Sequence, residues 1–201
     1  MEIIRSFILE NEKRLSDFLD ENVGHMNSKD VAIVGILLAI GAILRYFFAM
    51  LNTPLTPNII IAFYCLAIIL LKPRLYEALG IGLVAGVLSM LISGSVFPQA
   101  NLISEPVGAY ACIMFYEILR HRENLAPLIT TFVATLASGF TFAGIATIFV
   151  SDTILAMYHG NFSEFVGVYV PIVVFTAMIN AVIVQILYLP LHRRIKREWN
   201  D

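Results

Sequence analysis

Charged residues are scarce in this sequence. Asp, Glu, Lys and Arg make up 14% of its 201 residues, whereas hydrophobic residues make up 59%. A typical soluble domain carries about 25% charged and about 45–50% apolar residues. The composition therefore excludes a soluble globular domain and predicts a polytopic membrane protein, and one helical bundle accounts for the whole length.

Cysteine is nearly absent, and both cysteines, Cys65 and Cys112, lie inside apolar runs without a CxxC spacing. They are typical of small buried hydrophobes and give no sign of a disulfide. The histidines are His25, His121, His159 and His192. None stands beside carboxylates or cysteines at metal-ligand spacing, so we expect neither a metal nor a cofactor.

Motifs of nucleotide binding and catalysis are missing as well. No lysine follows a glycine-rich loop, and no HExxH or GxSxG occurs. The sequence therefore indicates no ATP site and no common hydrolase centre. No nucleophile–base pair is visible, so an intramembrane enzyme is the least favoured alternative. Inverted repeats, the usual mark of a self-sufficient secondary transporter, are not evident either.

What is present is a series of apolar runs long enough for membrane helices, each of which needs about 20 residues. They lie at 31–51, 57–71, 76–93, 105–119, 125–150 and 165–191. At the helical rise of about 1.5 Å per residue, the second run is short, so we expect its start to lie below the membrane surface. The fold predicted is an all-α membrane protein with six transmembrane helices in a single bundle.

Lysine and arginine are distributed unevenly between the loops. They lie before the first span, in the loop between the second and third spans, in the loop between the fourth and fifth spans, and after the sixth span: Lys29, Lys72, Arg74, Arg120, Arg122, Arg193, Arg194, Lys196 and Arg197. The loops at 52–56, 94–104 and 151–164 contain neither residue. The positive-inside rule then places both termini in the cytoplasm and these three loops outside. Attraction to anionic lipid explains the basic residues without a nucleic-acid partner.

Residues 1–28 form a separate segment before the predicted membrane domain, 29–197. Apolar side chains recur there at helical spacing among charged ones: Ile4, Phe7, Ile8, Leu15, Phe18 and Leu19. This pattern favours an amphipathic helix lying on the inner membrane surface. Docking to a partner is the alternative.

Polar residues gather in the stretch 97–110, FPQANLISEPVGAY, at the outer end of the fourth span. Ser104 is expected to cap that helix, with Glu105 and Pro106 as its first residues. Polar or ionisable residues within spans are functional candidates. The candidate substrate-binding residues are Arg45, Asn58, Gln99, Asn101, Glu105, Tyr110 and Asn180.

Each candidate also has a structural alternative. Arg45 can snorkel outward or pair with Glu105, Asn180 can bond to a neighbouring helix, and Glu105 can be a favourable charge at a helix start. If these residues converge, they suit a small organic ligand. Arg45 and the outward helix N-termini suit a carboxylate, Glu105 suits an amine, and the aromatic residues of the outer half suit a ring.

Small residues at four-residue spacing indicate close helix packing in lipid. Ala78, Gly82 and Gly86 form such a face on the third span, and we expect it to pack within the bundle. Gly35 and Ala39 form a shorter face on the first span, which suits either the bundle or an external helix.

Three short stretches carry a family resemblance. They are the segment 35–42 (GILLAIGA), the pair Pro57 and Asn58, and Phe97–Pro98 followed by Asn101, Pro106, Val107 and Ala109. On these residues the chain resembles the substrate-binding S component of energy-coupling-factor transporters, and most closely the tryptophan-transporter branch. That branch has an aspartate where this sequence has Asn58, and a basic residue where it has Glu105. Both departures change the charge expected at the pocket.

The resemblance implies a membrane subunit of an ATP-driven importer in a prokaryotic plasma membrane. Such a subunit captures tryptophan, a related aromatic amino acid or a vitamin from outside, while a transmembrane coupling subunit and two cytoplasmic ATPases supply the work. The resemblance also implies that small residues of the first span, here Gly35, Ala39 and Ala42, contact the coupling subunit. The alternative from another class is a non-transporting membrane interaction protein.

Overall fold

The computed structural model describes residues 5, 9, 26–50, 58–122 and 125–198, and within them all regular structure is helical. The helices are α2 (Ser28–Met50), α3 (Ile60–Leu71), α4 (Leu75–Ile92), the 3₁₀ turn η1 (Pro98–Ala100), α5 (Asn101–Leu119), α6 (Ala126–Met157) and α7 (Phe162–Glu198). Five of these segments are long and apolar enough to cross a membrane. The prediction of an all-α, six-helix membrane protein is confirmed, whereas the predicted segment 1–28 and the loop 52–56 lie largely or wholly outside the described residues.

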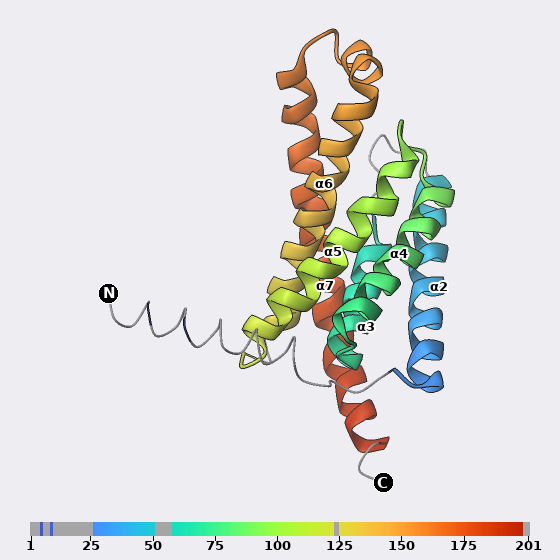
Figure 1. Cartoon of the computed structure of the whole chain (residues 1–201), viewed down its shortest axis with the longest axis vertical. Coiled ribbons are helices and arrows are strands. Elements are labelled where there is room, and N and C mark those ends of the chain that lie inside the picture. The colour runs from blue at the N-terminus through green and yellow to red at the C-terminus, as the bar shows by residue number, and fades with distance from the viewer. Residues whose placement is uncertain (1–4, 6–8, 10–25, 51–57, 123–124, 199–201) are drawn as a thin grey trace.

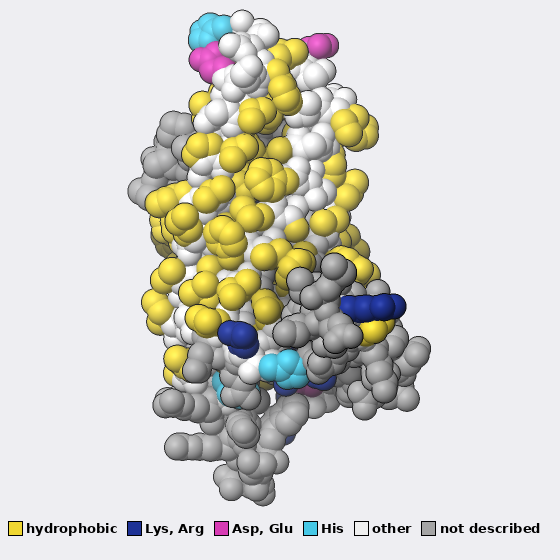
Figure 2. All heavy atoms as spheres, turned by 90° about the vertical axis from the view of Figure 1, so that its left-hand side faces the viewer, with side chains coloured by type: hydrophobic (Ala, Val, Ile, Leu, Met, Phe, Trp, Pro, Cys, Tyr) yellow, Lys and Arg dark blue, Asp and Glu magenta, His cyan; other side chains and the backbone are white. Residues whose placement is uncertain are grey.

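The surface supports a membrane-spanning orientation along the long axis of the molecule. Figure 2 shows hydrophobic side chains spread over the middle of one face. Acidic side chains and a histidine lie at the end where α6 meets α7, and Lys, Arg and further histidine side chains lie at the opposite end. A polar–apolar–polar banding of this kind matches the layers of a bilayer. Which end faces the cytoplasm stays a prediction.

Helix α3 is the centre of the bundle. Each of its residues from Ile60 to Ile69 is buried, because α2, α4, α5, α6 and α7 all pack against it. A helix that is hydrophobic all round is stable only when it is enclosed in this way. The expectation of a short second span is confirmed, but the helix begins at Ile60 rather than at residue 57, which lies outside the described residues.

Glycines bring α4 and α5 into backbone contact. A Cβ placed on Gly82 would lie 2.8 Å from Ala109 Cβ, and one placed on Gly86 would lie 2.7 Å from the carbonyl oxygen of Asn101. Neither position has room for a side chain, so the predicted small-residue packing face of the third span is confirmed. The close contact fixes the start of α5 against the end of α4.

The fourth helix begins earlier than predicted. Pro98 opens η1, which leads directly into α5 at Asn101. Ser104, Glu105 and Pro106 consequently lie inside the helix, and Ser104 is not its N-cap. The prediction was wrong because Pro98, and not Pro106, starts the helical segment, since proline is tolerated at a first helical position.

The predicted outer loop 151–164 is also mostly helical. α6 continues to Met157 through non-helical backbone at Val150 (φ −134°, ψ 35°), and α7 already starts at Phe162. His159 and Gly160 have positive φ and make the tight turn between them. Figure 1 shows the resulting α6–α7 hairpin rising beyond the ends of the other helices. The polar residues that suggested a long loop lie on this projecting hairpin.

Candidate substrate pocket

A cavity of about 510 Å³ is lined by residues from α2, α3, α4, α5, α6 and α7 and from the segments next to them. Its polar lining comes from α2, the residues before α3, the loop after α4, the start of α5, and the middle of α6 and α7: Arg45, Asn58, Ser93, Ser95, Asn101, Ser104, Glu105, Thr135, Ser138 and Thr176. Its aromatic lining comes from α6, α7 and the turn between them, and from the residue before η1: Phe97, Phe142, Tyr158, Phe165 and Tyr169. The cavity thus has a polar floor and an aromatic upper part.

Glu105 lies at the polar floor and is fully buried. Asn58 Nδ2 donates to its Oε1, and Ser138 Oγ donates to its Oε2 over 3.1 Å. These two bonds join the start of α3 and the middle of α6 to α5. Among the described residues no Lys, Arg or His side chain forms an ion pair with Glu105. A buried carboxylate held only by neutral donors retains capacity for a positively charged partner.

Arg45 lines the same cavity from α2 and is 6% exposed. Its Nη1 donates to Ser89 Oγ of α4 over 2.7 Å. The guanidinium is neither snorkelled to the surface nor ion-paired with Glu105, so both structural alternatives for Arg45 are wrong. A guanidinium has five N–H donors, and Ser89 is the one hydrogen-bond partner of Arg45 among the described residues, so within this part of the chain donors remain for a ligand.

Asn180 is buried in α7 outside the cavity lining. Its Nδ2 donates to the carbonyl oxygen of Asn58 over 3.0 Å and to Thr135 Oγ1 over 3.3 Å. The amide therefore ties α7 to α6 and to the residue that enters the cavity ahead of α3. This placement matches the structural alternative for Asn180, a hydrogen bond to a neighbouring helix. Asn180 therefore acts on the pocket only through Asn58.

Asn101 is one of the sequence candidates that reach the cavity, and its Nδ2 donates to the Pro98 carbonyl over 2.7 Å. The structure thus brings together Arg45, Asn58, Asn101 and Glu105. Gln99 is exposed and lies outside this lining.

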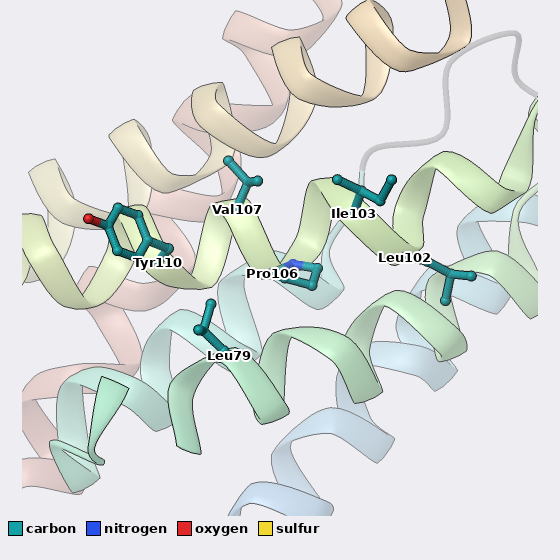
Figure 3. A pocket seen from close by; sticks show the side chains of 6 residues that line it. All are labelled: Leu79, Leu102, Ile103, Pro106, Val107 and Tyr110. Atoms are coloured by element: carbon teal, nitrogen blue, oxygen red, sulfur yellow. The ribbon is translucent and has the colours of Figure 1, made fainter. Parts of the chain in front are cut away.

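Tyr110 lies away from the cavity. It is 45% exposed and lines an open apolar groove on the outside of the bundle, together with Leu79, Pro106 and neighbouring apolar residues. Figure 3 shows this groove between α4 and α5. Tyr110 lies five positions after Glu105 on α5. At the helical turn per residue, the two side chains therefore point about 140° apart around the helix. The groove faces the region where lipid would lie and contains none of the charged candidates.

Sequence reasoning missed Ser104 and Ser138 as cavity residues, and Ser89 as the partner of Arg45. A single serine in an apolar span carries no pattern, and Ser138 sits beside Gly139 in a run of small residues that is typical of helix packing. Tyr169, treated in the sequence only as one of many aromatics, donates to the carbonyl oxygen of Gly139 over 3.1 Å and borders the cavity.

Comparison with known proteins decides the family. The model of the family "Tryptophan transporter TrpP" matches residues 27–196. The chain belongs to this family. A relative in Bacillus subtilis (strain 168), described as a probable tryptophan transport protein, is 27% identical over 176 residues, which cover 86% of this chain and 95% of the relative. No solved structure matches.

Membership of the TrpP family confirms the resemblance to the tryptophan-transporter branch and identifies a multi-pass membrane protein of a transporter family rather than an enzyme. It also disfavours the alternative of a non-transporting interaction protein.

Proposed function

We propose that the chain is the substrate-binding S component of an energy-coupling-factor importer, and that its cavity captures tryptophan from the outer side. The observation that carries the proposal is the convergence of Arg45, Asn58, Asn101 and Glu105 on one cavity with an aromatic upper part. The family match supports tryptophan as the ligand.

The cavity suits an amino acid with a large ring. Its volume of about 510 Å³ falls within the range of about 300–1,000 Å³ that is usual for small-molecule sites. Arg45 and Glu105 offer opposite charges to a carboxylate and an ammonium group. Phe97, Phe142 and Tyr169 offer apolar faces to an indole ring, for which stacked and edge-on contacts are favourable. The ligand would be oriented with its charged end at the polar floor.

The energy for uptake comes from partner proteins in this proposal. The sequence carries no glycine-rich phosphate-binding loop, which fits a division of work in which a transmembrane coupling subunit and two ATPases supply the energy. Gly35 and Ala39 are exposed on α2, and a Cβ on Gly35 would meet nothing within 4 Å. These two residues permit close approach of an external helix. Ala42 is partly buried against the core of the bundle, so its contribution to such a contact is smaller.

Binding is tested with the purified protein in detergent or nanodiscs. Isothermal titration calorimetry with tryptophan, and with a panel of water-soluble vitamins as comparison, should give a saturable signal for tryptophan alone. No binding of tryptophan would contradict the substrate assignment.

Coupling is tested separately by uptake of labelled tryptophan into cells that carry or lack the coupling subunit and ATPases. Uptake should require them. The double variant Gly35→Leu, Ala39→Leu should abolish uptake and co-purification of the coupling subunit while tryptophan binding remains. Gly80→Leu is the matched control, because Gly80 is exposed on α4 with nothing within 4 Å of its Cβ position. Uptake without the partners would overturn the S-component assignment and leave the binding result standing.

A further inference from the structure

The floor of the cavity contains hydrogen-bond acceptors that have no partner. Ser104 Oγ and Asn58 Oδ1 are shielded from solvent and accept or donate no hydrogen bond within the described part of the chain. Glu105 belongs to the same lining, with its two carboxylate oxygens already oriented by Asn58 Nδ2 and Ser138 Oγ. Unsatisfied buried acceptors are rare in native proteins and indicate a missing partner.

The missing partner must be a donor with positive charge. The two residues that hold Glu105 are neutral, and the nearby guanidinium of Arg45 is directed to Ser89. The carboxylate therefore has no direct ion pair among the described residues, and a buried carboxylate without one gains free energy when a cation contacts it. A carboxylate, an amide oxygen and a hydroxyl oxygen together offer three acceptors.

We propose that Glu105, Asn58 and Ser104 form a subsite for a primary ammonium group and that this subsite makes a free amine a requirement for binding. A primary ammonium has three N–H donors, which match the three acceptors in number and sign. The inference rests on the proposed function for the aromatic part of the ligand, but the subsite itself concerns only the amine. Ser138 is a positioning residue that holds the Glu105 carboxylate.

The geometry of the three helices favours this selectivity. Asn58 enters ahead of α3, Ser104 and Glu105 lie on successive positions of α5, and Asn180 fixes the backbone of Asn58 from α7. The acceptors are therefore held before the ligand arrives, and preorganised groups lose little conformational entropy on binding. A ligand without the amine would leave all three acceptors unpaired, and sites built on buried polar groups reject such analogues strongly.

The test compares three probes on three proteins by calorimetry. The probes are tryptophan, tryptamine, which lacks the carboxylate, and indole-3-propionate, which lacks the amine. The proteins are the full chain, Glu105→Gln, and the control Glu117→Gln, which alters a buried carboxylate at the other end of α5 that pairs with Arg120. Thermal unfolding checks that each variant is folded.

The wild-type protein should bind indole-3-propionate at least about 30-fold more weakly than tryptophan, because the buried acceptors stay unpaired. Glu105→Gln should weaken the binding of tryptophan and of tryptamine by about 30-fold. It should change the affinity for indole-3-propionate by less than about threefold, because a direct contact with the amine couples the two effects. Glu117→Gln should change none of them. If Glu105→Gln does not fold, Ser104→Ala replaces it and should weaken the binding of tryptophan and tryptamine, but not of indole-3-propionate, by about fivefold.

Equal binding of tryptophan and indole-3-propionate to the wild type would overturn the ammonium subsite, as would equal weakening of all three probes by Glu105→Gln. Tryptophan binding that requires sodium ions, compared with choline, would assign the acceptors to a metal cation and likewise overturn it. Tryptamine binding that depends on Glu105, without tryptophan binding, would refute the proposed function and leave the subsite standing. Absence of binding by both amines would overturn both.

Discussion

Arg45 and Glu105 line the same cavity but do not pair with each other. Arg45 donates to Ser89 of α4, and Glu105 accepts from Asn58 and Ser138. Two opposite charges that are each held by neutral groups fit the zwitterion proposed as the ligand, because a direct ion pair between them would have satisfied both in its absence.

Arg45 is expected to hold the carboxylate end of tryptophan. Arg45→Gln should weaken tryptophan binding by about 30-fold, since it removes a charge-assisted hydrogen bond in a buried site. Ser89→Ala should weaken it less, by about threefold, because Ser89 only orients the guanidinium. Calorimetry measures both, with Arg122→Gln as an exposed control. Unchanged affinity in Arg45→Gln would remove Arg45 from the site.

Asn180 is expected to stabilise the bundle. Asn180→Ala removes the donors to the Asn58 carbonyl and to Thr135 Oγ1, which should lower the free energy of unfolding by about 1–3 kcal/mol. Unfolding of the purified protein by titration with a denaturing detergent measures this loss. The exposed residue Gln99 provides the comparison, and Gln99→Ala should have no effect. Equal stability of the two variants would show that the Asn180 bonds contribute nothing.

The contact between α4 and α5 is expected to tolerate no side chain at Gly82. Gly82→Val should destabilise the protein by more than about 2 kcal/mol, because its Cβ would meet the backbone of Pro106 and the Ala109 side chain. Gly80→Val, two residues away on the same helix, faces open space and should be tolerated. Thermal unfolding of the pair distinguishes overpacking from the general cost of altering a helical glycine, and similar melting temperatures would contradict the packing described.

Tyr110 is expected to have no role in binding, although it lies only five residues from Glu105. Tyr110→Ala should leave tryptophan affinity within about twofold of the wild type, since the side chain lines the outer groove rather than the cavity. Tyr169→Ala, which alters the aromatic lining, should weaken binding clearly. The reverse order of effects would place the ligand in the groove between α4 and α5.

The sequence was sufficient to predict the helices, their number and the shortness of α3, because lipid imposes long apolar runs that composition reveals directly. It also led to Arg45, Asn58, Asn101 and Glu105, since charged and amide groups stand out in apolar spans. Tyr110 and Gln99 were chosen by nearness in sequence, but the turn of α5 and the exposure of η1 point them elsewhere.

Other features depended on tertiary packing and left no local trace. The start of α5 was misplaced because two prolines, Pro98 and Pro106, each satisfy the rule for a helix start, and only the contact with Gly86 favours the earlier one. Ser138 was missed because its role comes from facing Glu105 across the gap between α6 and α5. The length of α6 was underestimated because polar residues on a projecting hairpin resemble a loop.

A structure with 5-bromotryptophan bound would test the central claim most directly. The anomalous signal of bromine would locate the ring independently of the density for the polar groups. We expect one bromine peak in the upper part of the cavity, among Phe97, Phe142 and Tyr169, with the amino acid end directed at Arg45 and Glu105. A peak in the apolar groove beside Tyr110, or no peak in a crystal soaked to saturation, would contradict it.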